Sequence, residues 1–528
     1  MPADDAPALT TARLGHGLAG SSVRLGALAA FIWLACSIGL RPLTLPEEGR
    51  YVGVAWEMLR SGQWLVPTED GLPFFHKPPL FYWLTAASMQ VFGVNAAAAR
   101  LAPLLGATLG TAGLYFVAKR WAGERVARWA VLVLVTAPFF FAGAQFANLD
   151  MLVAAFMALA VLCAAQAALE VRAGRPHRAA VIGAWAAAAL GVLAKGLIGV
   201  VLPGLVIVAW LLTTRQARTL LALLWPAGPA VFLLIAGPWF VAVQMRYPGF
   251  AHFFFVYQHF ERFAATGFNN AQPWWFFIAT LPLLTMPWSF WLLRASFRAR
   301  ADEAPEAALL RRLMWTWLVV VVAFFSIPQS KPIGYMMAVL FPIAYLVADA
   351  LARLSRDGAG RAFALAITSV AASALICVAL LAYFSLAYDR DNTALARTLL
   401  RLRAPGDPVV FVGEYFFDIP LHARLPGPVP VISDWHDPGI AKQDNWKREL
   451  AEAAPYAPAV AAAVLVDARQ GFALRCGPAP LWVVAKSDAE SGVAALPGAT
   501  RVELSHRVAL WRVGAGGCAA AEPARASP

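Results

Sequence analysis

Charged residues are scarce in this chain of 528 residues. They make up 14% of the sequence, while 60% of the residues are hydrophobic. Soluble proteins carry about 25% charged residues, so a 14% share cannot cover the surface of a soluble protein of this size. The chain must expose apolar surface to lipid, and we predict a polytopic α-helical membrane protein.

An excess of negative charge is also lacking, because the formal net charge is +12. In a soluble protein this value would suggest a nucleic-acid partner. Here the Lys and Arg residues lie in short runs between apolar segments, which is typical of a membrane-topology signal. We expect contact with membrane lipid and no nucleic acid.

Cysteine is rare, with five residues in the chain. Cys36, Cys163 and Cys377 lie inside apolar runs and are interpreted as packing residues. Cys476 and Cys518 lie in the polar C-terminal region, where a disulfide between them stays open if that region is outside the cytoplasm. No CxxC pattern and no Cys/His spacing typical of zinc occurs. The motifs therefore specify no cofactor and no metal ligands, and they leave a divalent metal open.

Long apolar runs, by contrast, are plentiful. A helix needs about 20 apolar residues to cross the hydrocarbon core of a bilayer. About eleven runs approach this length, with a shorter one at 78–93, and they predict about 11–13 transmembrane helices. The runs lie near 23–40, 101–118, 127–144, 150–169, 179–194, 197–213, 219–243, 273–293, 312–327, 333–352 and 362–387.

The loops between these runs differ in positive charge. The positive-inside rule assigns the loops that are rich in Lys and Arg to the cytoplasm. Alternation then puts the N-terminus in the cytoplasm, and it puts the loops at 41–100 and 244–272 on the far side. The first run is interpreted as a retained helix, because no convincing cleavage site follows it. The positive loops lie at 119–128, 172–178, 215–218, 294–312 and 353–361.

The composition changes after residue 388. Short apolar runs typical of strands occur there, separated by Gly and Pro. We predict a transmembrane domain over 1–388 and a small extracytoplasmic α/β domain over 389–528, with a disordered tail. The strand-like runs are 408–413, 429–433, 462–467 and 481–485.

Three acids on the far side are catalytic candidates. Glu47 and Glu48 follow the first apolar run in the segment LPEEGRY, and Asp150 opens a later run. Each has a structural alternative, since carboxylates often cap helix N-termini. Ionisable residues beside membrane spans nevertheless mark functional sites more often than other residues do.

Cations lie in the same set of loops. Lys77 precedes two prolines that can start a helix, and an anion between the lysine and the helix N-terminus would be stabilised there. Arg262 has the fork-shaped side chain that suits phosphate. Arg50 and Lys331 are further candidates, with Tyr335 close to Lys331 in the sequence. The alternative for the lysines is an interfacial position beside aromatic residues.

Other polar residues accompany these cations. His76 and Tyr82 flank the Lys77 segment, and His252 and His259 are seven residues apart, so they would share one face of a helix. Two histidines on a helix are more often structural than metal ligands. We include His76, Tyr82 and His259 as residues of the candidate cavity.

Acids and cations around a cavity at the membrane surface suit one kind of substrate. It has a polar reacting centre, a phosphate and a long apolar tail, as a lipid-linked sugar phosphate does. The competing class is a lipid-sugar transporter or flippase. Transporters carry ionisable groups near the bilayer midplane and often have internal repeats, and this sequence shows neither feature.

The order of the motifs resembles a known family. The segments are PEEGRY (46–51), WLVP (64–67), HKPP (76–79), Asp150, Lys195-Gly196, HFERF (259–263) and SKPIGY (330–335). They resemble the polyprenyl-phosphate-dependent glycosyltransferases of the GT-C fold. The likeness is to the bacterial aminoarabinose transferases of lipid A and their relatives near the protein O-mannosyltransferases. It covers about residues 20–350 and implies a multi-pass protein of the bacterial inner membrane.

The resemblance implies an inverting transfer of sugar from a polyprenyl-phosphate donor to an extracytoplasmic acceptor. That acceptor is lipid A or a related glycolipid, with a protein Ser or Thr as the alternative. Glu47 takes the place of the family's catalytic Asp, and Asp150 takes the place of its second acid. Arg50, Lys77 and Arg262 would hold the lipid phosphate, and Lys331 and Tyr335 would flank the same cavity.

Two positions depart from the family pattern. Glu47 is one methylene longer than the family's Asp, so the catalytic assignment stays open between Glu47 and Glu48. His76 replaces the family's Glu before Lys77, which removes a carboxylate from that position. These changes suggest a branch with a different sugar or acceptor.

Overall fold

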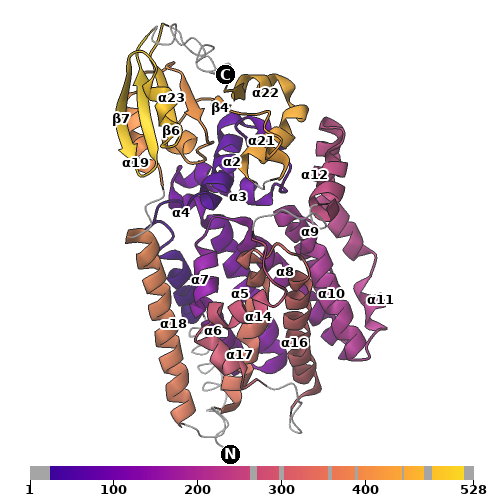
Figure 1. Cartoon of the computed structure of the whole chain (residues 1–528). Coiled ribbons are helices and arrows are strands. Elements are labelled where there is room, and N and C mark those ends of the chain that lie inside the picture. Colours follow the sequence, from indigo (N-terminus) through magenta and orange to yellow (C-terminus); the bar gives the residue numbers. More distant parts are fainter. Residues whose placement is uncertain are drawn as a thin grey trace, which may run out of the picture.

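A helical bundle with a mixed sheet stacked on one end makes up the protein, as the computed structural model shows (Figure 1). This arrangement confirms the predicted fold class of a polytopic helical protein with a C-terminal α/β region. The residues that the structure describes are 24–261, 270–295, 303–354, 360–386, 391–442, 445–468 and 478–515.

Among the described residues, seven helices are long and apolar enough to cross a membrane, or eight if one bent pair counts as a span. The seven are α5 (Leu101–Ala122), α8 (Leu149–Arg172), α9 (Arg178–Lys195), α12 (Ala227–Arg246), α16 (Pro305–Ser326), the Ile333–Leu354 segment (η2, Ile333–Val339, and α17, Leu340–Leu354) and α18 (Gly360–Leu386). The bent pair is α6 (Glu124–Thr136) and α7 (Pro138–Ala144), which meet at 69°. Shorter apolar helices are Arg24–Ala35, α3 (Leu80–Phe92) and α10 (Ile198–Thr213).

Three of the expected apolar runs are broken. The run at 127–144 forms the bent pair α6 and α7, with Pro138 at the start of α7. The run at 273–293 forms α14 (Phe276–Leu284) and α15 (Trp288–Leu292), and Pro287 stands directly before α15. The run at 219–243 forms α11 (Thr219–Leu223) and α12, with Pro226 at the N-cap of α12. Proline lacks the N–H that a continuous helix needs, so these breaks follow from the sequence.

Helix α8 lies at the centre of the bundle. Its apolar stretch is 78% buried, whereas that of α18 is 17% buried, and α18 stands at the edge of the bundle (Figure 1). Many residues of α8 are alanines, and Gly106 of α5 packs directly against the backbone of Leu152. Small residues allow helices to approach closely in a membrane, where packing rather than water drives association.

A layer of short elements lies between the bundle and the sheet (Figure 1). It consists of α2 (Glu47–Ser61), the hairpin of β1 (Thr68–Glu69) and β2 (Leu72–Pro73), α3 and α4 (Ala96–Ala99). The hairpin turn is Asp70-Gly71, and both residues have positive φ values, 51° and 76°. Such a turn matches the twist of the paired strands. Leu72 is buried in the core of the sheet region, so this layer joins the two parts of the protein.

The six-stranded sheet has the order β5-β4-β3-β6-β8-β7. Strands β3 (Val409–Val412), β4 (Val431–Ser433), β5 (Leu465–Asp467) and β6 (Leu481–Lys486) are parallel, and each falls in a predicted strand-like run. The antiparallel hairpin β7 (Ala499–Ser505) and β8 (Val508–Val513) completes the sheet and was not predicted. The remaining helical elements are the π-helix η1 (His252–Glu261), α19 (Thr393–Leu402), α20 (Ile419–His422), η3 (Ile440–Lys442), α21 (Trp446–Ala453), η4 (Ala454–Tyr456), α22 (Pro458–Val464) and α23 (Glu490–Ala494). We call the described residues from 391 to 515 the sheet domain.

Candidate functional site

The adjacent acids at the start of α2 have opposite surroundings. The side chain of Glu47 is 47% exposed, whereas that of Glu48 is fully buried. Consecutive residues on a helix point in directions about 100° apart, so a helix that begins at Glu47 can place one acid outside and the other inside.

Glu48 is the centre of a buried charge network that we call the Glu48 hub. Its carboxylate accepts hydrogen bonds from Arg41 at 2.5 Å and from Arg100 at 2.8 Å. It also accepts the backbone N–H groups of Thr44 and Ala147, each at 2.8 Å. Burial alone would raise the pKa of this carboxyl, but Arg100 and Arg41 outweigh burial and lower it from 4.5 to about 2. The Glu48 carboxylate is therefore ionised. The hub joins the first loop to the residues just before α8.

Glu47 belongs to a second group, which lies around Arg50. The Nη2 atom of Arg50 donates to Glu47 Oε1 and to the Tyr51 hydroxyl, both at 3.2 Å. The Nη1 atom donates to Glu449 Oε1 at 2.8 Å. The Arg50 guanidinium also lies over the ring of Tyr51, 4.8 Å from its centroid. Arg50 is thus shared between the exposed acid of α2 and an acid of the sheet domain.

Asp150 forms a third group with residues that are distant in sequence. Asn148 caps α8 by accepting the Asp150 N–H at 3.0 Å, and the Asp150 carboxylate pairs with Lys195 at the end of α9. The Lys195 ammonium lies 5.2 Å from the centroid of the Tyr335 ring. These three side chains line one small cavity. Burial raises the pKa of the Tyr51 hydroxyl, and the charges of Arg50 and Lys195 oppose this rise.

The Lys77 segment follows the predicted pattern, because α3 begins at Leu80, directly after Pro78 and Pro79. Lys77 is half-buried, and its neighbour His76 is buried. The ring atom Nδ1 of His76 lies 3.0 Å from the Gln258 amide nitrogen, and Nε2 lies 3.8 Å from the Glu452 carboxylate.

Tyr82, on the first turn of α3, is fully buried, and its ring centroid lies 6.5 Å from that of Tyr51. This places Tyr82 behind the Arg50 group.

Lys331 makes hydrogen bonds to backbone carbonyl groups. It is buried, its backbone N–H bonds Asn270 O at 3.0 Å, and its ammonium donates to the carbonyl of Pro328. Arg262 lies outside the described residues, as do the side chain of His259 and both Cys476 and Cys518. The structure therefore brings together Glu47 with Arg50, and Asp150 with Tyr335.

Sequence reasoning missed several residues of the site. Lys195 was noted only as part of a Lys-Gly motif, although a lysine at the end of an apolar run is itself a signal. Arg100, which pairs with Glu48, gives a similar signal, because it is a cation directly before the apolar run of α5. Glu449 gave no signal, because it lies 399 residues from Arg50 in the chain.

An apolar groove shares helix α16 with the small cavity of the Asp150 group. Its volume is about 750 Å³, and α14, α15 and α16 supply most of its lining. Representative lining residues are Trp274, Leu281, Phe290, Val322 and Ser326. Ser326 follows Phe325, which lines the small cavity of Asp150 and Lys195.

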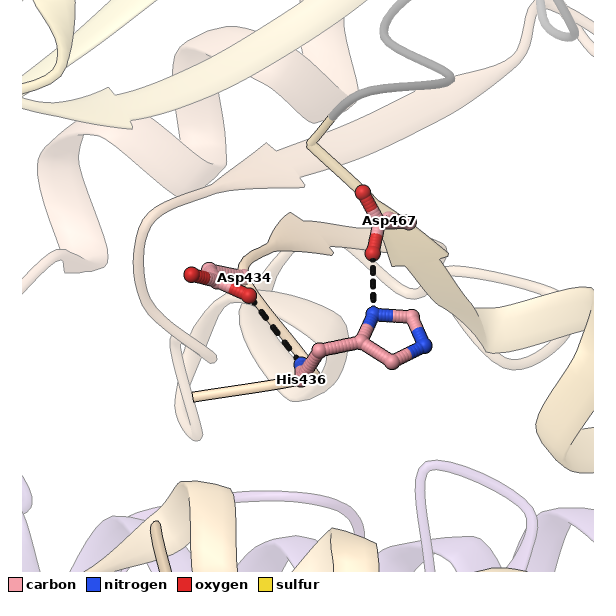
Figure 2. Close-up of side chains that lie close together, drawn as sticks. All are labelled: Asp434, His436 and Asp467. Carbon is pink, nitrogen blue, oxygen red and sulfur yellow. Dashed lines mark hydrogen bonds and ion pairs between the residues drawn. The ribbon is translucent and has the colours of Figure 1, made fainter. Parts of the chain in front are cut away.

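Among the described residues, one group offers three metal-ligating side chains, and it lies in the sheet domain (Figure 2). The three residues are Asp434, His436 and Asp467, at the carboxyl ends of β4 and β5. His436 Nδ1 lies 2.6 Å from Asp467 Oδ2, and Asp434 accepts the backbone N–H of His436 at 3.1 Å. Imidazole and carboxylate groups of this kind can bind a divalent cation.

Known proteins resemble the chain in sequence. The family model of dolichyl-phosphate-mannose-protein mannosyltransferases matches residues 76–241. An undecaprenyl phosphate-alpha-4-amino-4-deoxy-L-arabinose arabinosyl transferase of Pseudomonas savastanoi pv. phaseolicola is 32% identical over 361 residues, which is 67% of this chain and 66% of that protein. The protein of the same name from Aeromonas salmonicida is 31% identical over 67% of this chain and 66% of its own length. The match thus spans slightly less than two thirds of these relatives.

Solved structures resemble the chain over most of its length. The crystal structure of ArnT from Cupriavidus metallidurans in the apo state matches with a TM-score of 0.79 and 25% identity, covering 95% of this chain and 99% of that one. The same protein bound to undecaprenyl phosphate matches with a TM-score of 0.80 and 24% identity, covering 94% and 99%. The archaeal oligosaccharyltransferase AglB from Archaeoglobus fulgidus shares the fold at a TM-score of 0.52 and 14% identity, covering 88% and 70%.

Proposed function

Since the chain belongs to the GT-C family of polyprenyl-phosphate-dependent glycosyltransferases, we propose that it transfers a sugar from a polyprenyl-phosphate donor to lipid A or a related glycolipid. The observations that carry this proposal are the ion pairs Glu47–Arg50 and Asp150–Lys195, together with an apolar groove of about 750 Å³ that is lined mostly by α14, α15 and α16. The names of the relatives favour 4-amino-4-deoxy-L-arabinose as the sugar. The protein would act as a multi-pass enzyme of the bacterial inner membrane, with the site on the periplasmic side.

The polar groups have separate roles in the proposed reaction. The bond between the anomeric carbon and the phosphate oxygen breaks, and its electron pair leaves with the polyprenyl phosphate. Lys77, with Arg262, would stabilise the charge that develops on this phosphate in a site of low dielectric. The apolar tail would lie in the groove.

Glu47 acts on the acceptor in this proposal. An acceptor hydroxyl gives its proton to Glu47 as its oxygen bonds the anomeric carbon, whereas an acceptor phosphate oxygen needs only to be positioned. One displacement inverts the anomeric centre. Glu47 is favoured over Glu48, because Glu47 is exposed while all contacts of Glu48 are internal. Asp150 and Lys195 form an ion pair between α8 and α9.

The test is transfer of radiolabelled 4-amino-4-deoxy-L-arabinose from undecaprenyl phosphate to lipid A by the purified protein. Glu47→Gln and Lys77→Ala should each lower transfer at least 100-fold, as removal of a charge-stabilising group typically does. The matched controls are Glu124→Gln and Lys119→Ala. The two native residues form a partly exposed ion pair at the C-terminal end of α5. These two variants should retain transfer. Full activity in both site variants would refute the site assignment.

Transfer to a protein Ser or Thr is the second acceptor class, and the mannosyltransferase family model is the observation that favours it. Mass spectrometry of total lipids and periplasmic proteins from a deletion strain separates the two. Loss of the sugar from lipid A supports the proposal, whereas loss from proteins alone supports the alternative. Labelling of cysteines introduced at Lys119 and Lys486 tests the proposed sidedness, since only the second should react from the periplasm.

A further inference from the structure

Helix α21 of the sheet domain contacts the candidate site with one face. Its other face, which includes Trp446, Leu450 and Ala453, packs in the core of the sheet domain. Two of its other residues, Glu449 and Glu452, are one turn apart and reach the layer between the sheet and the bundle. The sheet domain is therefore joined to the site by charged groups on a firmly packed helix.

Glu449 controls the orientation of Arg50. Its Oε1 atom holds Nη1 at 2.8 Å, while Nη2 of the same guanidinium holds Glu47 at 3.2 Å. Because the guanidinium is planar and rigid, fixing one edge fixes the other. Glu449 is 9% exposed and Arg50 is 18% exposed, so solvent screens this pair little. The contact with Glu449 thus fixes the position from which Nη2 of Arg50 bonds Glu47.

Glu452 contacts two residues that are distant from it in sequence, Tyr257 and His76. Its Oε1 atom accepts from the Tyr257 hydroxyl and from Arg448 Nε, both at 2.6 Å. Its carboxylate faces His76 Nε2 at 3.8 Å. The Gln258 amide nitrogen lies 3.0 Å from Nδ1 of that ring, so Nε2 is the ring nitrogen that faces Glu452.

We propose that α21 positions the reacting groups from the sheet domain, with Glu449 acting through Arg50 on Glu47 and Glu452 acting through His76 on the adjacent Lys77. Both are positioning residues, because neither is assigned a contact with substrate. The inference rests on the proposed function and adds to it a distinct task for each acid. Glu449 serves the acceptor side of the reaction, and Glu452 serves the donor phosphate.

Steady-state kinetics of the full-length protein in nanodiscs tests this division. The donor is undecaprenyl phosphate-linked 4-amino-4-deoxy-L-arabinose, varied at saturating lipid A. Glu449→Gln should lower kcat at least tenfold and change the donor KM less than twofold. Glu452→Gln should raise the donor KM at least fivefold and change kcat less than twofold. A merely structural role would lower the active fraction in both and leave the donor KM unchanged, and that result would overturn the proposal.

A double-mutant cycle tests whether Glu449 acts through Arg50. In the Arg50→Gln background, Glu449→Gln should change kcat less than twofold, because its partner is absent. Additive losses in the cycle would contradict the proposal. If Glu449→Gln yields no folded protein, Glu449→Asp takes its place and should lower kcat at least threefold, and an unchanged kcat would equally contradict it.

The matched control is Glu414→Gln, which removes a carboxylate of the same domain that pairs with Lys486 at 2.9 Å. It should leave kcat and KM unchanged, and a loss equal to that of Glu449→Gln would overturn the proposal. Absence of transfer by the wild-type protein would instead refute the proposed function. Wild-type transfer with normal kinetics in both α21 variants would refute this inference alone.

Discussion

The first loop buries carboxylates in two ways. At the Glu48 hub, one carboxylate is held by Arg41 and Arg100 and by two backbone N–H groups. In and beside the β1–β2 hairpin, Glu57, Glu69 and Asp70 are also buried, yet no arginine or lysine among the described residues forms an ion pair with any of them. Thus the same loop contains a neutralised acid and a cluster with an excess of acid.

The difference shows what burial does to a carboxyl group. At the hub, the arginines keep Glu48 ionised with a pKa of about 2. In the hairpin cluster, burial and then the charge of Glu449 raise the pKa of Glu69 well above its usual value. Neither oxygen of Glu69 has a hydrogen-bond partner among the described residues. A buried charge stabilises the fold only where partners offset its desolvation.

Removing one arginine of the hub should have the largest effect on stability. Arg100→Ala leaves Glu48 buried with one cation fewer, and breaking a buried pair in this way costs about 3–5 kcal/mol. The free energy of unfolding in detergent micelles measures the loss. The control Arg128→Ala removes an exposed partner of Glu124, so its cost should be below about 1 kcal/mol. Equal losses in the two variants would show that the buried Arg100–Glu48 pair contributes no more to stability than the exposed Arg128–Glu124 pair.

The second-largest effect on stability should come from a fall in pH, which weakens the Glu48 hub. The folded pKa of Glu48 is lowered from 4.5 to about 2, so its contribution is complete above pH 4.5 and disappears as the pH falls toward 2. The shift corresponds to about 3 kcal/mol. Thermal unfolding measured from pH 6 to pH 3 should show this decline in the wild type and a smaller decline in Glu48→Gln. Parallel pH profiles would contradict the assignment.

A smaller effect of opposite sign is expected in the hairpin. Glu69→Gln removes a carboxyl whose charged form is disfavoured by burial, so it should stabilise the protein by about 1 kcal/mol. Since the folded pKa of Glu69 is raised, its unfavourable contribution grows as the pH rises above 4.5, and the gain should be larger at pH 8 than at pH 5. Melting temperatures at the two pH values measure it.

The neighbouring acid provides the contrast for that experiment. Glu57 accepts hydrogen bonds from the Thr68 hydroxyl and from the N–H groups of Asp70 and Gly71. Glu57→Leu removes these three bonds and should destabilise the protein. Destabilisation by Glu69→Gln as well would mean that the two acids do not differ.

Much of the fold could be predicted from apolar runs, because a membrane helix must satisfy its own backbone hydrogen bonds. The strands β3 to β6 were predicted from runs rich in valine, whereas β7 has the mixed sequence ATRVELS and gave no such pattern. Asp150 was identified because it opens a helix. Its partner Lys195 could not be assigned, since pairing depends on how α8 and α9 pack. The contact of Arg50 with Glu449 depends on where a whole domain docks.

The Glu48 hub has a steric consequence for substrate choice. Its bonds to Thr44 and Ala147 fix the backbone on both sides of the site, so residue 47 cannot retreat to accommodate a longer side chain. In the proposed site, Glu47 would extend about one C–C bond, roughly 1.5 Å, further than an aspartate at the same position. A sugar and acceptor would then have to leave that much more room at this point, and the hub would help to determine substrate shape.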